Sequence, residues 1–337
     1  MSQQQPHSSN TTHQAPFTTS DKEYVVGADI GGTNLRLALA DMTGTIVAKW
    51  SVSTVGIRDP HIVVGLICDG VEHLLQQASA PRSSLRAIAA GAPGVTDVNE
   101  GIVIATSYLM GWREVPLRAL LESALGVPAA VDNDVNIAAI GENWAGAARG
   151  TRDFVFLAIG TGIGAGIVLN GRLFRGNGWT AGEIGYMLVP GTPEEPVERG
   201  KPGALEDIVG GEGVKAQWQN LWRENSTTLP RDATATQIFD HALDGNPLAQ
   251  AILQKSARTL AYAIYNISLI LNCPLFVLGG GVGMHSGLCD ATREILEQRG
   301  TRVQPQLAHS TLGTDAQLIG AIRLALDTAD SRLSLSS

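Results

Sequence analysis

The chain lacks several features that would place it in a specialised class of protein. Charged residues make up 17% of its 337 residues, aromatic residues 5%, and the net charge is −8. Nucleic-acid-binding surfaces usually depend on basic patches, and this sequence has none, which argues against such a partner. No apolar run approaches the roughly 18 residues of a membrane span. Hydrophobic residues make up 44% of the chain, which is enough for one large domain or two ordinary ones.

Cysteine is also scarce. Cys68, Cys273 and Cys289 lie far apart and have no CxxC spacing, which excludes a disulfide framework and favours a reducing compartment. Residues 1–22 are polar and have no apolar segment of the kind found in signal peptides, so we expect a disordered tail. A cytoplasmic protein is therefore expected.

Glycine, in contrast, is abundant and gathers in motifs. The first motif runs between two apolar segments as Asp29-Ile30-Gly31-Gly32-Thr33-Asn34. Glycine allows backbone N–H groups to approach an oxyanion closely. Asp29 could hold Mg²⁺ directly or through water, since that ion keeps much of its hydration shell, while Thr33 and Asn34 could donate to phosphate oxygens. The alternative is a glycine-rich hairpin with no ligand.

A similar pattern returns about 130 residues later. An apolar strand at Phe154–Ile159 is followed by Gly160-Thr161-Gly162-Ile163-Gly164, a second strand at 165–169 and an Asn-Gly turn. This repetition indicates duplicated domains. The glycines also match the GxGxxA dinucleotide fingerprint, but that motif requires a helix directly afterwards, where we expect a strand.

A third glycine motif, Gly279-Gly280-Gly281-Val282-Gly283, is predicted to form a loop after a strand at 275–278 and before a helix at 287–298. By itself it fits an ordinary strand-to-helix connection as well as a binding loop. Beside two phosphate turns, it becomes a candidate surface for adenine and ribose.

The strongest predictions of secondary structure outside these motifs come from apolar periodicity and end signals. Asp59-Pro60 predicts an N-cap with proline at the first helical position. The expected strands are 24–29, 35–41, 46–53, 85–90 and 127–131. The expected helices are 60–77, 116–125, 134–147, 233–243, 247–271 and 315–328.

Several acids fall where ligands bind in α/β folds. Asp132-Asn133-Asp134 lies at the end of a predicted strand and the start of a helix, where a carboxylate could take a hydroxyl proton while Asn133 holds the same substrate. The alternative is helix capping by Asp132 or Asn133. Glu183 and Glu206 are acids among small or apolar residues and could bind sugar hydroxyls, although each could equally be a surface acid.

Taken together, these motifs resemble the ROK family of sugar kinases, members of the actin, hexokinase and Hsp70 superfamily with a ribonuclease H-like fold. The resemblance covers the chain from Tyr24 to about Thr328. It implies that the first two glycine motifs are the two phosphate motifs of an ATP site and that the third is the adenosine motif. It further implies that Asp134 is the catalytic base, that Asn133, Glu183 and Glu206 contact the sugar, and that Gly94 borders it.

The chain departs from the family pattern at the sugar site. Tyr186 stands where the family has a histidine that ligates a structural zinc and approaches the sugar, and the region 189–203 contains no Cys or His. We therefore expect no zinc site. Tyr108 stands where the family often has an Asn that contacts the sugar, which leaves the identity of the sugar open.

The resemblance implies an α/β, two-domain ATPase fold with duplicated β-sheet domains. We expect a small N-terminal domain at 23–133, completed by the C-terminal helix 314–330, and a large domain at 134–313. The expected activity is ATP-dependent, Mg²⁺-assisted phosphorylation of a hexose, most simply O6 of glucose, by a homodimer. Alternatives are a kinase for another hexose or an N-acetylhexosamine, and a sugar-responsive transcriptional regulator. Only 28 residues precede Asp29, which disfavours the helix-turn-helix that such regulators carry.

Overall fold

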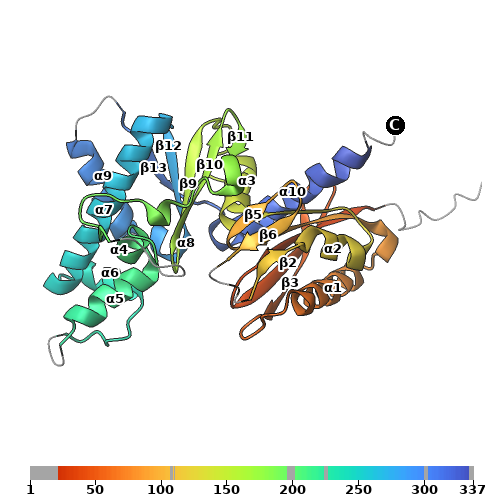
Figure 1. Ribbon diagram of the computed structural model, residues 1–337, viewed down its shortest axis with the longest axis horizontal. Coiled ribbons are helices and arrows are strands. Elements are labelled where there is room, and N and C mark those ends of the chain that lie inside the picture. The colour runs from red at the N-terminus through yellow and green to blue at the C-terminus, as the bar shows by residue number, and fades with distance from the viewer. Residues whose placement is uncertain are drawn as a thin grey trace, which may run out of the picture.

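Two five-stranded sheets of the same topology organise the computed structural model (Figure 1). The structure describes residues 22–106, 109, 111–195, 202–223, 227–299 and 303–333, apart from the side chains of 332 and 333. In each sheet two antiparallel hairpin strands lead into a central strand, which pairs in parallel with two later strands. The expected α/β fold with duplicated sheets is therefore confirmed.

The first sheet has the order β3-β2-β1-β4-β8. Its strands are β1 (Tyr24–Ile30), β2 (Asn34–Asp41), β3 (Ile46–Ser53), β4 (Leu85–Ala92) and β8 (Ala129–Asn133). One face packs on α1 (Pro60–Gln77) and α2 (Leu117–Leu125). Asp59 caps α1 by accepting from the backbone N–H of His61, with Pro60 at the first position, as predicted.

The second sheet has the order β11-β10-β9-β12-β13. Its strands are β9 (Phe154–Ile159), β10 (Ile163–Leu169), β11 (Arg172–Phe174), β12 (Leu275–Gly279) and β13 (Gln306–His309). One face is covered by helices that include α4 (Glu206–Val209), α5 (Gly211–Leu221), α6 (Ala235–Leu243), α7 (Pro247–Leu271), α8 (Gly280–Gly283) and α9 (Ser286–Gln298). These helices form the left half of the molecule in Figure 1.

Two helices cover the faces of the sheets that point toward each other. α10 (Ala316–Leu333) packs on the first sheet, and α3 (Asp134–Ala145) packs on the second. α3 and α10 are also in direct contact, near the middle of the view in Figure 1. Glycines make this contact close, because a Cβ at Gly141 would overlap the carbonyl oxygen of Ala316 and one at Gly320 that of Ile137.

Some elements were not expected from the sequence. A small antiparallel sheet contains β5 (Val95–Asp97), β6 (Ile102–Ala105) and β7 (Arg113–Val115), whose strands are too short to show a clear alternation. α4, α5 and β13 were also missed. The predicted loop at 279–283 is wrong, since Gly280–Gly283 form the single helical turn α8.

Other expectations have different outcomes. All three cysteines are free, as predicted. In the part of the chain that the structure describes, no helix has the length and apolar character needed to cross a bilayer. The domain limits 23–133 and 134–313, with 314–330 completing the first domain, stay a proposal.

The α3–α10 contact yields a test of the fold. Gly320→Ala should lower the free energy of unfolding by at least about 2 kcal/mol, because the new methyl group meets rigid backbone. Gly65→Ala is the matched control, since Gly65 lies on α1 with nothing near its Cβ position. It should be neutral or stabilise by about 0.5–1 kcal/mol. Urea unfolding measures both; equal effects would contradict the close contact.

Candidate active site

The first glycine motif forms the turn between β1 and β2. Gly31 N–H donates to the carbonyl of Asn34 at 2.9 Å, and the hydroxyl of Thr54 donates to the carbonyl of Gly31 at 2.8 Å. These bonds fix the backbone of the turn. Gly32, Thr33 and Asn34 are exposed at its tip, so their polar groups can meet an anion.

Asp29 lies near the end of β1, directly opposite Arg36 of β2. Nε and Nη2 of Arg36 donate to Oδ2 of Asp29 at 2.9 and 2.5 Å. Burial raises the pKa of Asp29, and the charge of Arg36 opposes this shift. Among the described residues no donor reaches Oδ1. One carboxylate oxygen thus fits a magnesium ion or one of its waters.

The second glycine motif turns between β9 and β10. The strand that follows excludes the dinucleotide fingerprint, which needs a helix there. The carbonyls of Gly160 and Thr161 accept from the backbone N–H groups of Gly211 and Glu212 at 2.8 and 3.1 Å. The start of α5 therefore supports this turn.

The third motif lies beside the second. β12 pairs in parallel with β9, with Gly279 opposite Ala158. A Cβ at Gly279 would lie 2.5 Å from the ring of Phe156, and Gly280 has φ +78° with its Cβ position against the carbonyl of Ile159. Packing alone therefore requires these two glycines, whereas Gly281 is exposed with open space around it. An adenosine site here stays a prediction.

Asp134 begins α3 at the edge of the first sheet and is half-buried. Its Oδ1 accepts from the backbone N–H of Val135 at 2.9 Å. Burial, and then the charge of Asp29, raises the pKa of Asp134 from 3.8 to about 7, with Glu183 adding to the shift. In the described part of the chain no basic side chain pairs with it. A carboxyl with this pKa is suited to accept a proton near neutral pH.

The neighbouring carboxylate, Asp132, is in a different position. It is buried at the end of β8, and Nε and Nη2 of Arg175 donate to its Oδ2 at 3.0 and 2.6 Å. Its Oδ1 accepts from the N–H of Asn133 and from Nδ2 of Asn136. Asp132 is therefore fully engaged, so it is not available as a base.

Asn133 caps α3, which was the alternative interpretation of this residue. Its Oδ1 accepts from the N–H groups of Val135 and Asn136, and its Nδ2 donates to the carbonyl of Gly94 at 2.9 Å. Gly94 has φ +99°, and a Cβ there would overlap the carbonyl of Ala105. Sugar contact by Asn133 stays a prediction that rests on the second N–H of its amide.

Glu183, Tyr186 and Glu206 lie close enough for their charges to interact. Partial desolvation and then Glu206 raise the pKa of Glu183, and desolvation and both glutamates raise the pKa of Tyr186. Oε2 of Glu206 accepts from the N–H of Ile163 at 3.0 Å, so Glu206 also holds the start of β10. Tyr186 is exposed, in a 3₁₀ turn at Ile184–Tyr186.

A small pocket of about 30 Å³ joins several of these groups. Gly94 and Asn133 line it from the first half of the chain, and Glu183 and Trp179 from the second. Trp179 has φ +66°, a left-handed conformation that is unusual for a bulky residue and is often found at functional sites. The pocket is too small to enclose a hexose.

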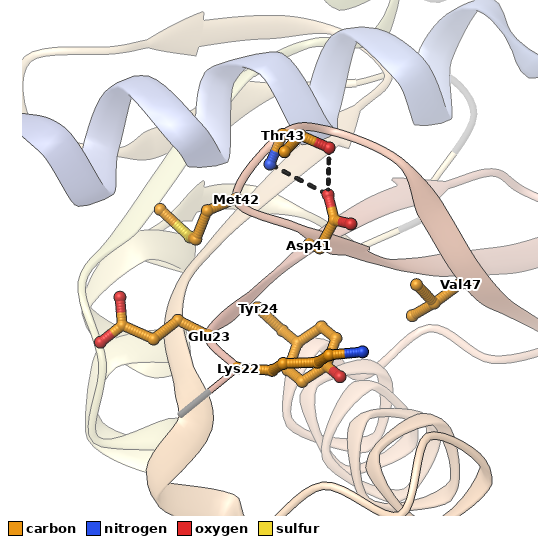
Figure 2. Close-up of a pocket in the computed structure, with 7 residues that line it drawn as sticks. All are labelled: Lys22, Glu23, Tyr24, Asp41, Met42, Thr43 and Val47. Atoms are coloured by element: carbon orange, nitrogen blue, oxygen red, sulfur yellow. Dashed lines mark hydrogen bonds between the residues drawn. The ribbon is translucent and has the colours of Figure 1, made fainter. Parts of the chain in front are cut away.

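A larger hollow of about 290 Å³ lies elsewhere (Figure 2). It is lined by Lys22, Glu23, Tyr24, Asp41, Met42, Thr43 and Val47, with Thr43 donating to Asp41. Tyr24 begins β1, five residues and about 16 Å from Asp29. None of the candidate site residues lines this hollow, so it is separate from the active site.

The zinc prediction stays a prediction. Among the described residues no three His, Cys, Asp or Glu side chains gather as a metal site. Tyr108 lies outside the described residues, as do 196–201 within the region 189–203.

Three residues of the site were not assigned from the sequence: Arg36, Arg175 and Trp179. Asp132 was considered only as a base or a helix cap, and its ion pair was not expected. Arg36 was detectable, because a hairpin centred on Gly32-Thr33 places it opposite Asp29. Arg175 had no such signal, since its partner comes from the other sheet.

Two duplicated sheets, two glycine turns and an acidic cluster between them define the two-domain class of the actin and hexokinase folds. The model of the ROK family matches residues 25–328, and the chain belongs to this family.

Individual relatives agree with this assignment. A glucokinase of Halalkalibacterium halodurans is 32% identical over 89% of this chain and 94% of its own. An N-acetylmannosamine kinase of Citrobacter koseri is 31% identical over 88% of this chain and 96% of its own. The structure of a ROK family glucokinase from Streptomyces griseus, in complex with glucose and AMPPNP, superposes with a TM-score of 0.75 at 26% identity, covering 90% of this chain and 99% of that one.

The pKa of Asp134 leads to a pH prediction. Below about pH 7 this carboxyl is protonated in the folded protein, so kcat/KM for the sugar should fall about tenfold per pH unit on the acid side. Asp134→Asn should lower kcat by about 10²–10⁴-fold. Initial rates of ADP formation between pH 5 and 9 measure both. A variant that keeps most of its rate would contradict the assignment.

The pH dependence of stability gives an independent check of the raised pKa of Asp134. Because the folded-state pKa lies above 3.8, the folded state binds the extra proton, and stability falls as pH rises from about 4 to 7. Asp134→Asn removes this cost. The Tm of the variant should therefore exceed that of the wild type at pH 8, and by a clearly smaller margin at pH 5. An equal difference at both pH values would show that the pKa of Asp134 is not raised.

Proposed function

We propose that this ATP-dependent sugar kinase transfers the γ-phosphoryl group of ATP to O6 of glucose. One observation carries the proposal: Asp134, which has no basic partner in the described structure and whose pKa is about 7, begins the helix between the two sheets. Both glycine hairpins are attached to sheets that contact this helix. A base and two anion-binding turns around one point support phosphoryl transfer to an alcohol.

In this proposal the protein mainly positions the reactants, because phosphoryl transfer needs alignment and charge neutralisation more than covalent help. Asp134 orients the sugar hydroxyl and accepts its proton as the new P–O bond forms. The exposed turn at Gly31, Gly32, Thr33 and Asn34 and the turn at Gly160, Thr161 and Gly162 hold the phosphates, and Gly279, Gly280 and Gly281 border the adenosine.

Asp29 would hold the magnesium that accompanies ATP, through its free oxygen or through a water. Such an ion neutralises charge on the phosphates. Burial raises the pKa of Asp29, and the positive charge of Arg36 opposes this shift by favouring the carboxylate.

Sugar recognition is assigned to Asn133, Glu183, Glu206 and Tyr186, with Gly94 at the border. Carboxylates can accept bonds from several hydroxyl groups, and buried polar groups left unpaired disfavour the wrong ligand. The pocket beside Asn133 and Glu183 is narrow, with Trp179 in its wall. Trp179 is a candidate for limiting the size of a substituent on the sugar.

Other features of the protein follow by family resemblance only. A homodimer and the absence of zinc stay predictions, and a regulator without kinase activity is the alternative that the sugar panel below addresses.

A panel of sugars tests the proposed function. Glucose, mannose, fructose, allose, N-acetylglucosamine and N-acetylmannosamine are compared in a coupled ADP assay with ATP and Mg²⁺. We expect the highest kcat/KM for glucose. If activity is highest with N-acetylmannosamine, that sugar replaces glucose as the proposed substrate. The absence of sugar-stimulated ADP formation would overturn the kinase assignment and favour the regulator.

Trp179→Gly tests whether the side chain of Trp179 limits the size of the sugar that the pocket beside Asn133 and Glu183 accepts. Glycine adopts a positive φ without strain, so the substitution should leave Tm unchanged or higher. The ratio of kcat/KM for N-acetylmannosamine to that for glucose should rise about tenfold, as expected for added room in a pocket. An unchanged ratio in a folded variant would remove Trp179 from the specificity argument.

A further inference from the structure

The Asp132–Arg175 ion pair joins the two halves of the candidate site. Asp132 lies at the end of β8 in the first sheet, and Arg175 follows β11 in the second. The side chain of Asp132 is 2% exposed and that of Arg175 is 26% exposed. No other ion pair among the described residues joins β8 to the second sheet.

The carboxylate of Asp132 is held on both oxygens. Oδ2 accepts from Nε and Nη2 of Arg175, while Oδ1 accepts from the N–H of Asn133 at 2.7 Å and from Nδ2 of Asn136 at 3.0 Å. Asn133 and Asn136 belong to the beginning of α3. The guanidinium is therefore tied, through one carboxylate, to the backbone that presents Asp134.

Arg175 also holds the loop that carries Glu183. Its carbonyl accepts from the N–H of Ala181 at 3.1 Å. At the other end of this loop, the carbonyl of Gly182 accepts from the N–H of Ala165 in β10 at 2.9 Å. The loop 176–183 is thus fixed at both ends, and between them it places Trp179 and Glu183 in the pocket wall opposite Asn133.

We propose that Arg175, through Asp132, is a positioning residue for the sugar: it sets the distance between Glu183 on the loop 176–183 and Asn133 and Asp134 at the start of α3. The proposal rests on the proposed function. Arginine suits this task, because its planar fork directs two N–H groups at one carboxylate in a fixed geometry, which a lysine cannot do. ATP binds at the glycine turns, which this pair does not contact.

The test separates positioning from general stability. In Arg175→Gln the sugar KM should rise at least about tenfold and kcat/KM for the sugar should fall about 100-fold, as expected for a displacement near 1 Å. KM for ATP should stay within about twofold. Arg175→Lys, which keeps the charge but loses the fork, should recover part of the loss. Arg172→Gln, at an exposed position on β11 three residues before Arg175, should behave as the wild type.

A second variant removes the problem of an unpaired buried charge, which can itself destabilise the protein. Asp132→Asn combined with Arg175→Gln leaves no charge at this position and should show the same rise in sugar KM. The proposal is overturned if the double variant has the wild-type sugar KM, or if the KM values for sugar and ATP rise together. A wild-type protein that phosphorylates no sugar would instead contradict the proposed function.

Discussion

The contact between α3 and α10 is the constraint on which the rest of the structure depends. Each helix covers one sheet, so the two sheets can share a site only because the helices approach each other closely. Gly141 and Gly320 permit that approach, and Gly27 permits the same on β1, where a Cβ would lie 2.8 Å from the N–H nitrogen of Ile322. The N-terminus of α3 then lies at the edge of the first sheet while its side packs on β10.

The charged side chains near the N-terminus of α3 distinguish Asp134 from the neighbouring carboxylates Asp29 and Asp132. Asp29, Gly91 and Asp132 lie in one row across β1, β4 and β8, so the two acids are about 10 Å apart. Each acid is paired with an arginine, Arg36 for Asp29 and Arg175 for Asp132. Asp134 is the acid whose pKa reaches about 7. Of the three acids Asp29, Asp132 and Asp134, the first two have arginine partners, so Asp134 is the one free to exchange a proton.

The sequence predicted the parts of this arrangement that local signals determine. Apolar periodicity and turn residues located β1, β2, β9 and β10 and the N-cap of α1, and the repeated pattern predicted the duplicated sheets. Short strands such as β5–β7 lack enough alternation to be recognised. Arg175 and Trp179 could not be assigned, because their importance comes from contacts between segments about 40 residues apart or more and from a left-handed backbone.

The glycines show why assigning a turn as a ligand-binding turn depends on the polar groups around it. Gly279 and Gly280 are required by close packing on β9, and Gly94 and Gly182 by carbonyls that would overlap a Cβ. A glycine pattern by itself therefore fits a packed turn as well as a binding turn. The polar groups next to a turn distinguish the two cases. The turn at Gly31 lies beside Asp29, which has a free carboxylate oxygen. The turn at Gly160 is followed by Ile163, whose N–H donates to Glu206. In the proposed function, these acids and the arginines that hold them specify the ligand.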